Sequence, residues 1–189
     1  MLPITLAIIS SLYSINPEKP NLFQPGTSLT VELGWQSGGQ HTPDGVRLSI
    51  GILTGLKGTT NWAYDISYVS GDDECHNGYC YEDWGLTVSG GLNRYFFITP
   101  DRRLYAVFTG GIFAGISHFE NGYWYNDEWD DDDTALVSGI FGKASILFNL
   151  DPISVGLGLF AGIGPSFGTE SGLEIYFPIG MHFTLHWSF

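Results

Sequence analysis

Bulky apolar residues alternate with small or polar residues along most of the chain after Pro25. The last segment shows this best: every second residue from Leu173 to Phe189 is apolar, and the residues between them are mostly small or polar. Successive side chains of a β-strand point to opposite faces, so a period of two predicts strands. No convincing helix pattern follows residue 25.

The alternation occurs in eight segments separated by turn-rich breaks. We expect strands over residues 29–36, 46–52, 62–68, 84–93, 104–116, 136–148, 153–164 and 173–189. The fifth segment is ambiguous, because both of its faces are fairly apolar. The longer breaks are 37–44, 71–83, 118–133 and 165–172, and they alternate with the shorter breaks 57–61, 99–103 and 149–152. This alternation predicts an antiparallel up-and-down meander with both chain ends on the short-turn side.

The face opposite the bulky residues is rich in Gly, Ser, Thr and Asn and carries too little charge to meet water. Only 14% of all residues are charged, whereas soluble domains average about 25%. No apolar run reaches the roughly 20 residues of a membrane helix. A soluble barrel has its bulky apolar face inside and its charged face towards water, and the present pattern is the reverse. It predicts an all-β fold, an eight-stranded antiparallel up-and-down transmembrane β-barrel with its bulky face towards lipid.

Aromatic residues near the ends of the predicted strands agree with this orientation. Two girdles of aromatic side chains mark the membrane interfaces of such barrels. The candidates for these girdles are Trp35, Trp62, Tyr68, Trp84, Phe96, Phe148 and Trp187.

In strand number, loop alternation and the aromatic-ended last strand from His182 to Phe189, the chain resembles the small eight-stranded outer-membrane barrels of Gram-negative bacteria, of the OmpA transmembrane domain and OmpX type. The resemblance covers residues 25–189. It implies a monomer in the bacterial outer membrane, in contact with outer-membrane lipid and lipopolysaccharide. It also implies that the barrel assembly machinery reads the terminal Phe189. For residues 1–24 we expect a truncated or atypical signal peptide.

The chain is strongly acidic, with 20 Asp and Glu residues against 7 Lys and Arg residues and a formal charge of −13. This balance argues against nucleic-acid binding. Most acids fall in or beside the longer breaks, whereas most bases lie towards the short turns. In an outer membrane the acidic rim would lie beside lipopolysaccharide and could share its divalent cations.

The densest acidic stretch falls in the break 118–133, together with Tyr123, Trp124, Tyr125 and Trp129. It lacks the spacing and glycine of an EF-hand, so we expect no resident cofactor and interpret it first as a hydrated, self-repelling loop. Weak binding of Ca²⁺ or Mg²⁺ is the alternative. Its candidate ligands are Asp127, Glu128, Asp130, Asp131, Asp132 and Asp133. The aromatic residues could contact a sugar or protein partner, or pack on the barrel rim.

Cys75 and Cys80 bracket the tight-turn signal Asn77-Gly78. Exported chains meet oxidising conditions, so we expect a disulfide across this hairpin. A metal site that uses both cysteines, His76 and neighbouring acids is the alternative, but no second Cys or His pair completes a standard zinc site.

Several charged and titratable residues fall on the inward face, where an unpaired charge is costly. We expect them to form a charge network that plugs the lumen. Its predicted members are Glu32, Arg47, Asp65, Lys143, Glu174, His182 and His186. The alternative is a gated pore or proton-sensitive passage, although eight strands leave room for side chains or one small ligand only.

His186 and Ser188 have a spacing that resembles the dyad of lipid A deacylases. An orienting acid and an oxyanion site are not recognisable, so we predict no enzyme activity. The sequence favours a structural or surface-interaction role for the acidic, aromatic loops. A narrow pore or carrier for small or hydrophobic solutes is the alternative, and a soluble ligand-binding barrel is a third.

Overall fold

The computed structural model describes residues 27–39, 42–55, 59–71, 74–76, 79–81, 83–120, 132–150, 152–169 and 172–188. These residues form antiparallel strands and no helix, so none of them belongs to a helix long and apolar enough to cross a membrane. The strands are β1 (Ser28–Gly38), β2 (Gly45–Gly55), β3 (Thr60–Gly71), β4 (Glu74–His76), β5 (Tyr79–Tyr81), β6 (Trp84–Phe97), β7 (Leu104–Glu120), β8 (Asp132–Asn149), β9 (Ile153–Gly168), β10 (Gly172–Tyr176) and β11 (Pro178–Ser188).

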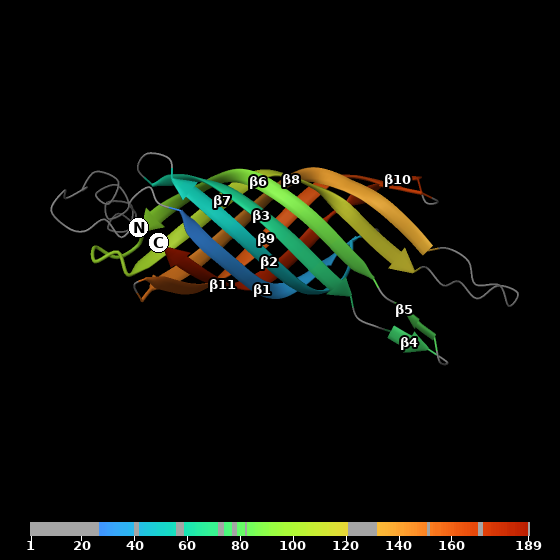
Figure 1. Ribbon diagram of the computed structural model, residues 1–189, viewed down its shortest axis with the longest axis horizontal. Coiled ribbons are helices and arrows are strands. Elements are labelled where there is room, and N and C mark those ends of the chain that lie inside the picture. The colour runs from blue at the N-terminus through green and yellow to red at the C-terminus, as the bar shows by residue number, and fades with distance from the viewer. Residues whose placement is uncertain are drawn as a thin grey trace, which may run out of the picture.

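All strands except β4 and β5 belong to one closed barrel (Figure 1). Consecutive strands pair, and β1 also pairs with β11, which closes the sheet and leaves no free edge. The start of β1 and the end of β11 lie together, since Ser28 is the partner of Ser188. The up-and-down, eight-stranded barrel expected from the sequence is confirmed.

Two prolines interrupt the hydrogen-bond ladders without changing the register. β10 and β11 are parts of one strand that breaks at Phe177, because the next residue, Pro178, has no N–H to donate. The pairing with β9 nevertheless continues in the same register on both sides of the break. The ladder between β8 and β9 skips the level of Pro165 for the same reason. The break predicted over residues 165–172 therefore begins too early, since β9 continues through Pro165 to Gly168.

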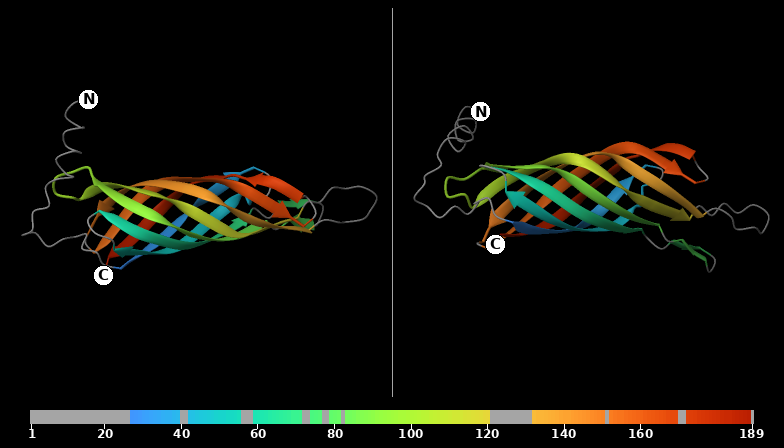
Figure 2. Two further views of the ribbon diagram at one scale, coloured as in Figure 1. Left: turned by 90° about the horizontal axis from the view of Figure 1, so that it is seen from above. Right: turned by 45° about the horizontal axis from the view of Figure 1, so that its top comes forward.

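The strands are strongly staggered and tilted, as the two further views in Figure 2 show. A path through paired residues once around the barrel starts at Ser28 and returns to β1 at Gly38. It passes Leu53, Ala63, Gly91, Gly111, Phe141, Gly162 and Pro178. A barrel of eight strands with such a stagger has an interior that side chains fill.

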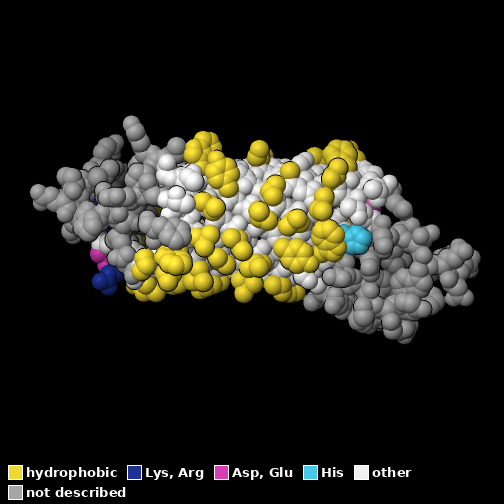
Figure 3. Space-filling model, in the orientation of Figure 1, with side chains coloured by type: hydrophobic (Ala, Val, Ile, Leu, Met, Phe, Trp, Pro, Cys, Tyr) yellow, Lys and Arg dark blue, Asp and Glu magenta, His cyan; other side chains and the backbone are white. Residues whose placement is uncertain are grey.

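The bulky apolar face points outward on every strand of the barrel. Ile112, Leu157 and Leu173 are 68–69% exposed, and apolar side chains are spread over the visible wall in Figure 3. Ile175, Phe183 and Trp187 also lie on this outer face. A soluble barrel would bury this face, so the alternative of a soluble ligand-binding barrel loses its basis.

The structure also settles the ambiguous fifth segment. On β7, Phe108 and Ile112 point outward, whereas Tyr105 and Phe113 are buried in the interior. Both faces are apolar because this strand contributes aromatic side chains to the lumen as well as to the outer wall.

Candidate functional site

The centre of the lumen holds two carboxylates and two cations from four different strands. Arg47 Nη1 on β2 lies 3.2 Å from Glu32 Oε2 on β1, and Lys143 Nζ on β8 lies 3.0 Å from the same oxygen. Lys143 Nζ is also 3.1 Å from Asp65 Oδ2 on β3, and Arg47 Nη2 is 3.8 Å from Asp65 Oδ1. The four formal charges cancel, which lowers the cost of burying them in the barrel.

Polar and aromatic neighbours hold this group in place. Ser49 and Ser67 donate hydrogen bonds to Asp65 Oδ1, and Arg47 donates one to the Ser67 hydroxyl. The Arg47 guanidinium also lies 4.4 Å from the ring centroid of Phe160, a cation–π contact that is stronger where water is excluded.

His182 lies beside the network in a space that a glycine leaves open. Its Nε2 is 3.8 Å from Glu32 Oε1 and 3.1 Å from the Ser145 hydroxyl, while its Nδ1 has no hydrogen-bond partner in the structure. A side chain at Gly158 would collide with both His182 and Ser145. Gly158 is therefore needed for the close approach of β9 to this histidine.

The structure places the other two predicted members away from this group. His186 lies on the short-turn side, where Tyr105 OH is 3.3 Å from its Nδ1 and the Tyr95 ring stacks on it. Glu174 is half-exposed on β10, on the long-loop side of Tyr176, and the ion pairs above do not include it.

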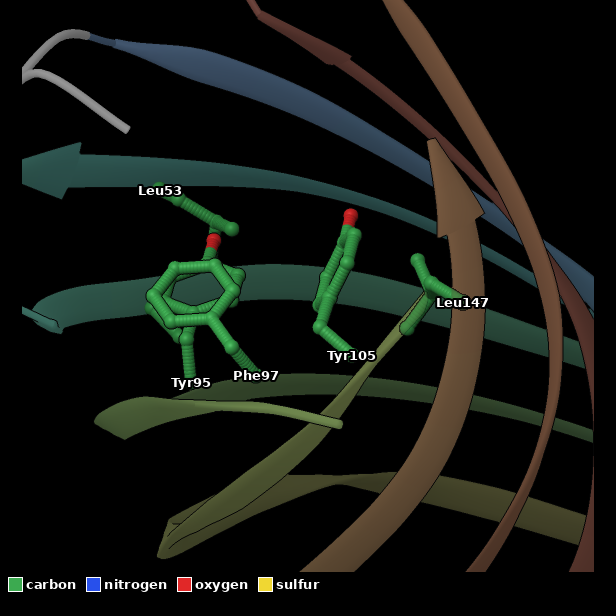
Figure 4. Close-up of a cluster of buried hydrophobic side chains, with 6 residues drawn as sticks. Leu53, Tyr95, Phe97, Tyr105 and Leu147 are labelled. Atoms are coloured by element: carbon green, nitrogen blue, oxygen red, sulfur yellow. The ribbon is translucent and has the colours of Figure 1, made fainter. Parts of the chain in front are cut away.

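A layer of buried apolar and aromatic side chains closes the lumen at the short-turn end. Figure 4 shows Leu53, Tyr95, Phe97, Tyr105 and Leu147 pointing into the interior, and they belong to β2, β6, β7 and β8. Arg102 in the turn before β7 places its guanidinium 5.1 Å from the ring centroid of Phe97, and its backbone adopts a φ of 59°. This layer forms a floor beneath the network.

A second layer, which we call the cover, closes the lumen at the long-loop end. Phe113, Val137 and Tyr176 pack together there, with Phe141 against them. The connection between β1 and β2 folds into this mouth: Pro43 is fully buried beside Gly85 of β6, and its carbonyl accepts a hydrogen bond from Gln36. The adjacent Thr42 accepts a hydrogen bond from the Phe177 backbone N–H, at the break between β10 and β11.

Among the described residues, a small cavity lies on each side of the network. The cavity towards the floor and the cavity towards the long loops each have a volume of about 40 Å³, and Asp65 and Lys143 line both. Each has room for only a few water molecules. The Lys143–Asp65 pair therefore borders both of these small cavities.

The sequence pattern identified the charged members of the site but missed the floor and the cover. Tyr95 and Phe97 follow the inward parity of Asn93, so a longer reading of that strand would have found them. Nothing in the pattern of residues 37–44 indicated that Pro43 enters the lumen.

The disulfide remains a prediction. Cys75 and Cys80 are paired residues of the β4–β5 hairpin, which projects from the long-loop end in Figure 1. The side chains of both cysteines lie outside the described part of the chain.

Most of the candidate cation ligands also lie outside the described residues. This holds for Asp127, Glu128, Asp130 and Asp131, and for the side chain of Asp132. Asp133 is buried, and its Oδ1 accepts hydrogen bonds from the backbone N–H and hydroxyl of Thr169. Among the described residues, no group of His, Cys, Asp or Glu could hold a metal ion. Phe189 is not described.

A closed eight-stranded wall, apolar outside and filled inside, is the architecture of small outer-membrane β-barrels. No protein-family model and no curated protein matches the sequence. Among solved structures, Neisserial surface protein A is similar at 8% sequence identity and a TM-score of 0.58, over 86% of this chain and 96% of that one. At this identity the likeness shows a shared fold.

Two further structures match with lower TM-scores. The N-terminal β-barrel domain of Pseudomonas aeruginosa OprF matches at 14% identity and a TM-score of 0.49, over 85% of this chain and 99% of that one. A major outer membrane protein from Thermus thermophilus matches at 10% identity and a TM-score of 0.46, over 86% of this chain and 99% of that one.

Proposed function

We propose that the chain is a monomeric β-barrel of the bacterial outer membrane whose lumen does not conduct, and that it acts as a structural or surface-interaction protein. The exposed apolar wall supports the membrane location. Leaving Ile112, Leu157 and their neighbours in water would forgo about 25 cal/mol for each Å² of apolar surface, whereas acyl chains cover them at no such cost. The charged side chains visible in Figure 3 lie at the two ends of the barrel.

The filled lumen is the single observation that carries the non-conducting role. An ion that crosses the barrel has to pass the floor around Tyr105, the ion pairs of Lys143 and the cover around Pro43. Breaking a buried ion pair costs several kcal/mol, because it leaves a charge without a partner. Three barriers in series favour a plug over an open pore.

A closed lumen leaves the long loops as the part of the protein that meets partners. Their acids, which include Asp127 to Asp133, would lie beside lipopolysaccharide and share its bridging Ca²⁺ or Mg²⁺ weakly, while Tyr123 to Tyr125 and Trp129 would contact a sugar or protein ligand. Phe189 at the chain end would serve recognition by the barrel assembly machinery.

A narrow pore is the second candidate, and the two small cavities favour it. Asp65 and Lys143 line both cavities, so a rearrangement of this pair would bring them together.

Conductance across planar lipid bilayers distinguishes the two functions. We expect no steady openings from the unaltered protein. A variant with Glu32, Arg47, Asp65 and Lys143 all replaced by Gly removes the charges in balance. If it retains the mobility shift of a folded barrel on an unheated gel and opens, the method detects an unplugged barrel; if it stays closed, the floor and the cover suffice to block the lumen. Steady openings of the unaltered protein would contradict the plug and establish the narrow pore.

A further inference from the structure

Arg94 is the one Asp, Glu, Lys or Arg with a described side chain on the outward face of the barrel strands. It follows the outward parity of Val88 and Leu92 on β6 and is exposed. The other charged side chains described on the strands, such as Arg47 and Lys143, point into the lumen. An outward charge is costly in the middle of a bilayer and is tolerated near its surface.

Arg94 lies on the outer wall near the short-turn end of the barrel. It lies close to the end of β6 that leads into a short turn, and its paired residue Thr60 is the first residue of β3. Its guanidinium carbon lies 5.4 Å from the ring centroid of Phe96, and this ring meets Phe108 edge-on with 5.4 Å between centroids. The two rings form an aromatic shelf on the outer wall, and Arg94 rests on it.

Arg94 has no carboxylate partner among the described residues, in contrast to the exposed Arg103. Arg103 Nε lies 3.6 Å from Asp101 Oδ2. Hydrogen bonds from the Thr99 hydroxyl and the Arg103 backbone N–H lower the pKa of Asp101, so this carboxylate stays ionised beside its arginine. The guanidinium of Arg94 has five N–H donors in a planar fork, which suit phosphate oxygens.

We propose that Arg94, positioned on the Phe96–Phe108 shelf, binds the headgroup phosphate of an anionic phospholipid in the leaflet at the short-turn end. On the outward face at this depth, lipid headgroups are the abundant source of anions. A phospholipid with an uncharged headgroup alcohol carries a net negative charge, whereas the amine of a zwitterionic lipid neutralises its own phosphate. The hydroxyl of the paired Thr60 lies on the same outward face and offers a further donor.

This inference rests on the proposed membrane location. It is tested with the purified full-length protein in phosphatidylcholine vesicles that contain a small fraction of spin-labelled phosphatidylglycerol or spin-labelled phosphatidylcholine. Electron paramagnetic resonance gives the motionally restricted fraction of each labelled lipid, and hence the preference of the barrel surface for the anionic one. We expect a several-fold preference for phosphatidylglycerol that decreases at high salt, as a contact between exposed charges does.

The variant Arg94→Gln keeps a polar side chain and should reduce this preference to about one. Phe96→Leu, which keeps the arginine and removes half of the shelf, should reduce it in part. Arg103→Gln is the matched control and should leave it unchanged, because Asp101 already neutralises Arg103. Folding of each variant is checked by its mobility on an unheated gel.

An unaltered preference in Arg94→Gln would overturn the proposal, as would an unaltered protein that inserts but shows no preference. A protein that fails to insert into vesicles at all would instead contradict the proposed membrane location, and the present inference with it.

Discussion

Lys143 Nζ lies 3.0 Å from Glu32 Oε2, although 111 positions separate the two residues in the chain. The contact crosses the lumen from β8 to β1, so it forms only when the sheet has closed. It is part of a neutral group of four charges, and each member depends on the others for compensation. The interior of this barrel is consequently sensitive to the loss of a single charge.

Replacing Arg47 by Met should destabilise the barrel by roughly 3–5 kcal/mol, because the variant leaves an uncompensated carboxylate in the lumen. Urea-induced unfolding in lipid vesicles, followed by tryptophan fluorescence, measures this loss. The control is Arg103→Met, which removes an exposed, solvent-screened ion pair and should change the stability little. Equal stabilities of Arg47→Met and the unaltered protein would argue against a buried network.

Gly158→Ala should destabilise the barrel by about 1–3 kcal/mol, since the added methyl group collides with His182 and Ser145. The second replacement Ser145→Gly should restore part of this loss by removing one of the two obstacles. Gly142→Ala on β8 is the matched control, because its methyl group meets only open space and ordinary contacts. The same urea titration compares the three variants, and a neutral Gly158→Ala would show that the histidine does not occupy this position.

The cysteines of the β4–β5 hairpin should be oxidised in the exported protein. Intact mass before and after treatment with a reductant should differ by two hydrogen atoms, and a thiol reagent should modify Cys75 and Cys80 only after reduction. Immediate modification of both thiols in the untreated protein would contradict the disulfide. The pairing of the two cysteines across the hairpin is the feature that makes the bond reachable.

The alternation of residues predicted which face of a strand each side chain lies on. The structure shows why the level of a residue along the barrel axis was harder to predict. Parity assigns Glu174, His182 and His186 to one inward face of the last strand, but only His182 reaches the central carboxylates. The level of a residue along the barrel depends on the stagger between strands, which arises from long-range pairing. A pattern within one strand does not contain that information.

The floor and the cover of the lumen were not predicted from the sequence, for different reasons. Tyr105 and Phe113 alternate with the outward Phe108 and Ile112 on β7, so aromatic residues on both faces obscured the direction of the strand. Pro43 lies in a connection with no alternation at all, and it packs beside Gly85 of β6, a strand that is not adjacent to β1 or β2. Such a contact is visible only after the barrel has closed.

The orientation of the apolar face is tested most directly by spin labels on the outer wall. In a background with Cys75 and Cys80 replaced by Ser, single cysteines at Ile112 and Leu157 are labelled and the protein is reconstituted in lipid vesicles. We expect oxygen, which dissolves in the bilayer, to relax both labels strongly, whereas a water-soluble nickel complex reaches only a reference label at Arg103. Labels at Ile112 and Leu157 that the nickel complex reaches, or that neither reagent reaches, would contradict a lipid-facing wall.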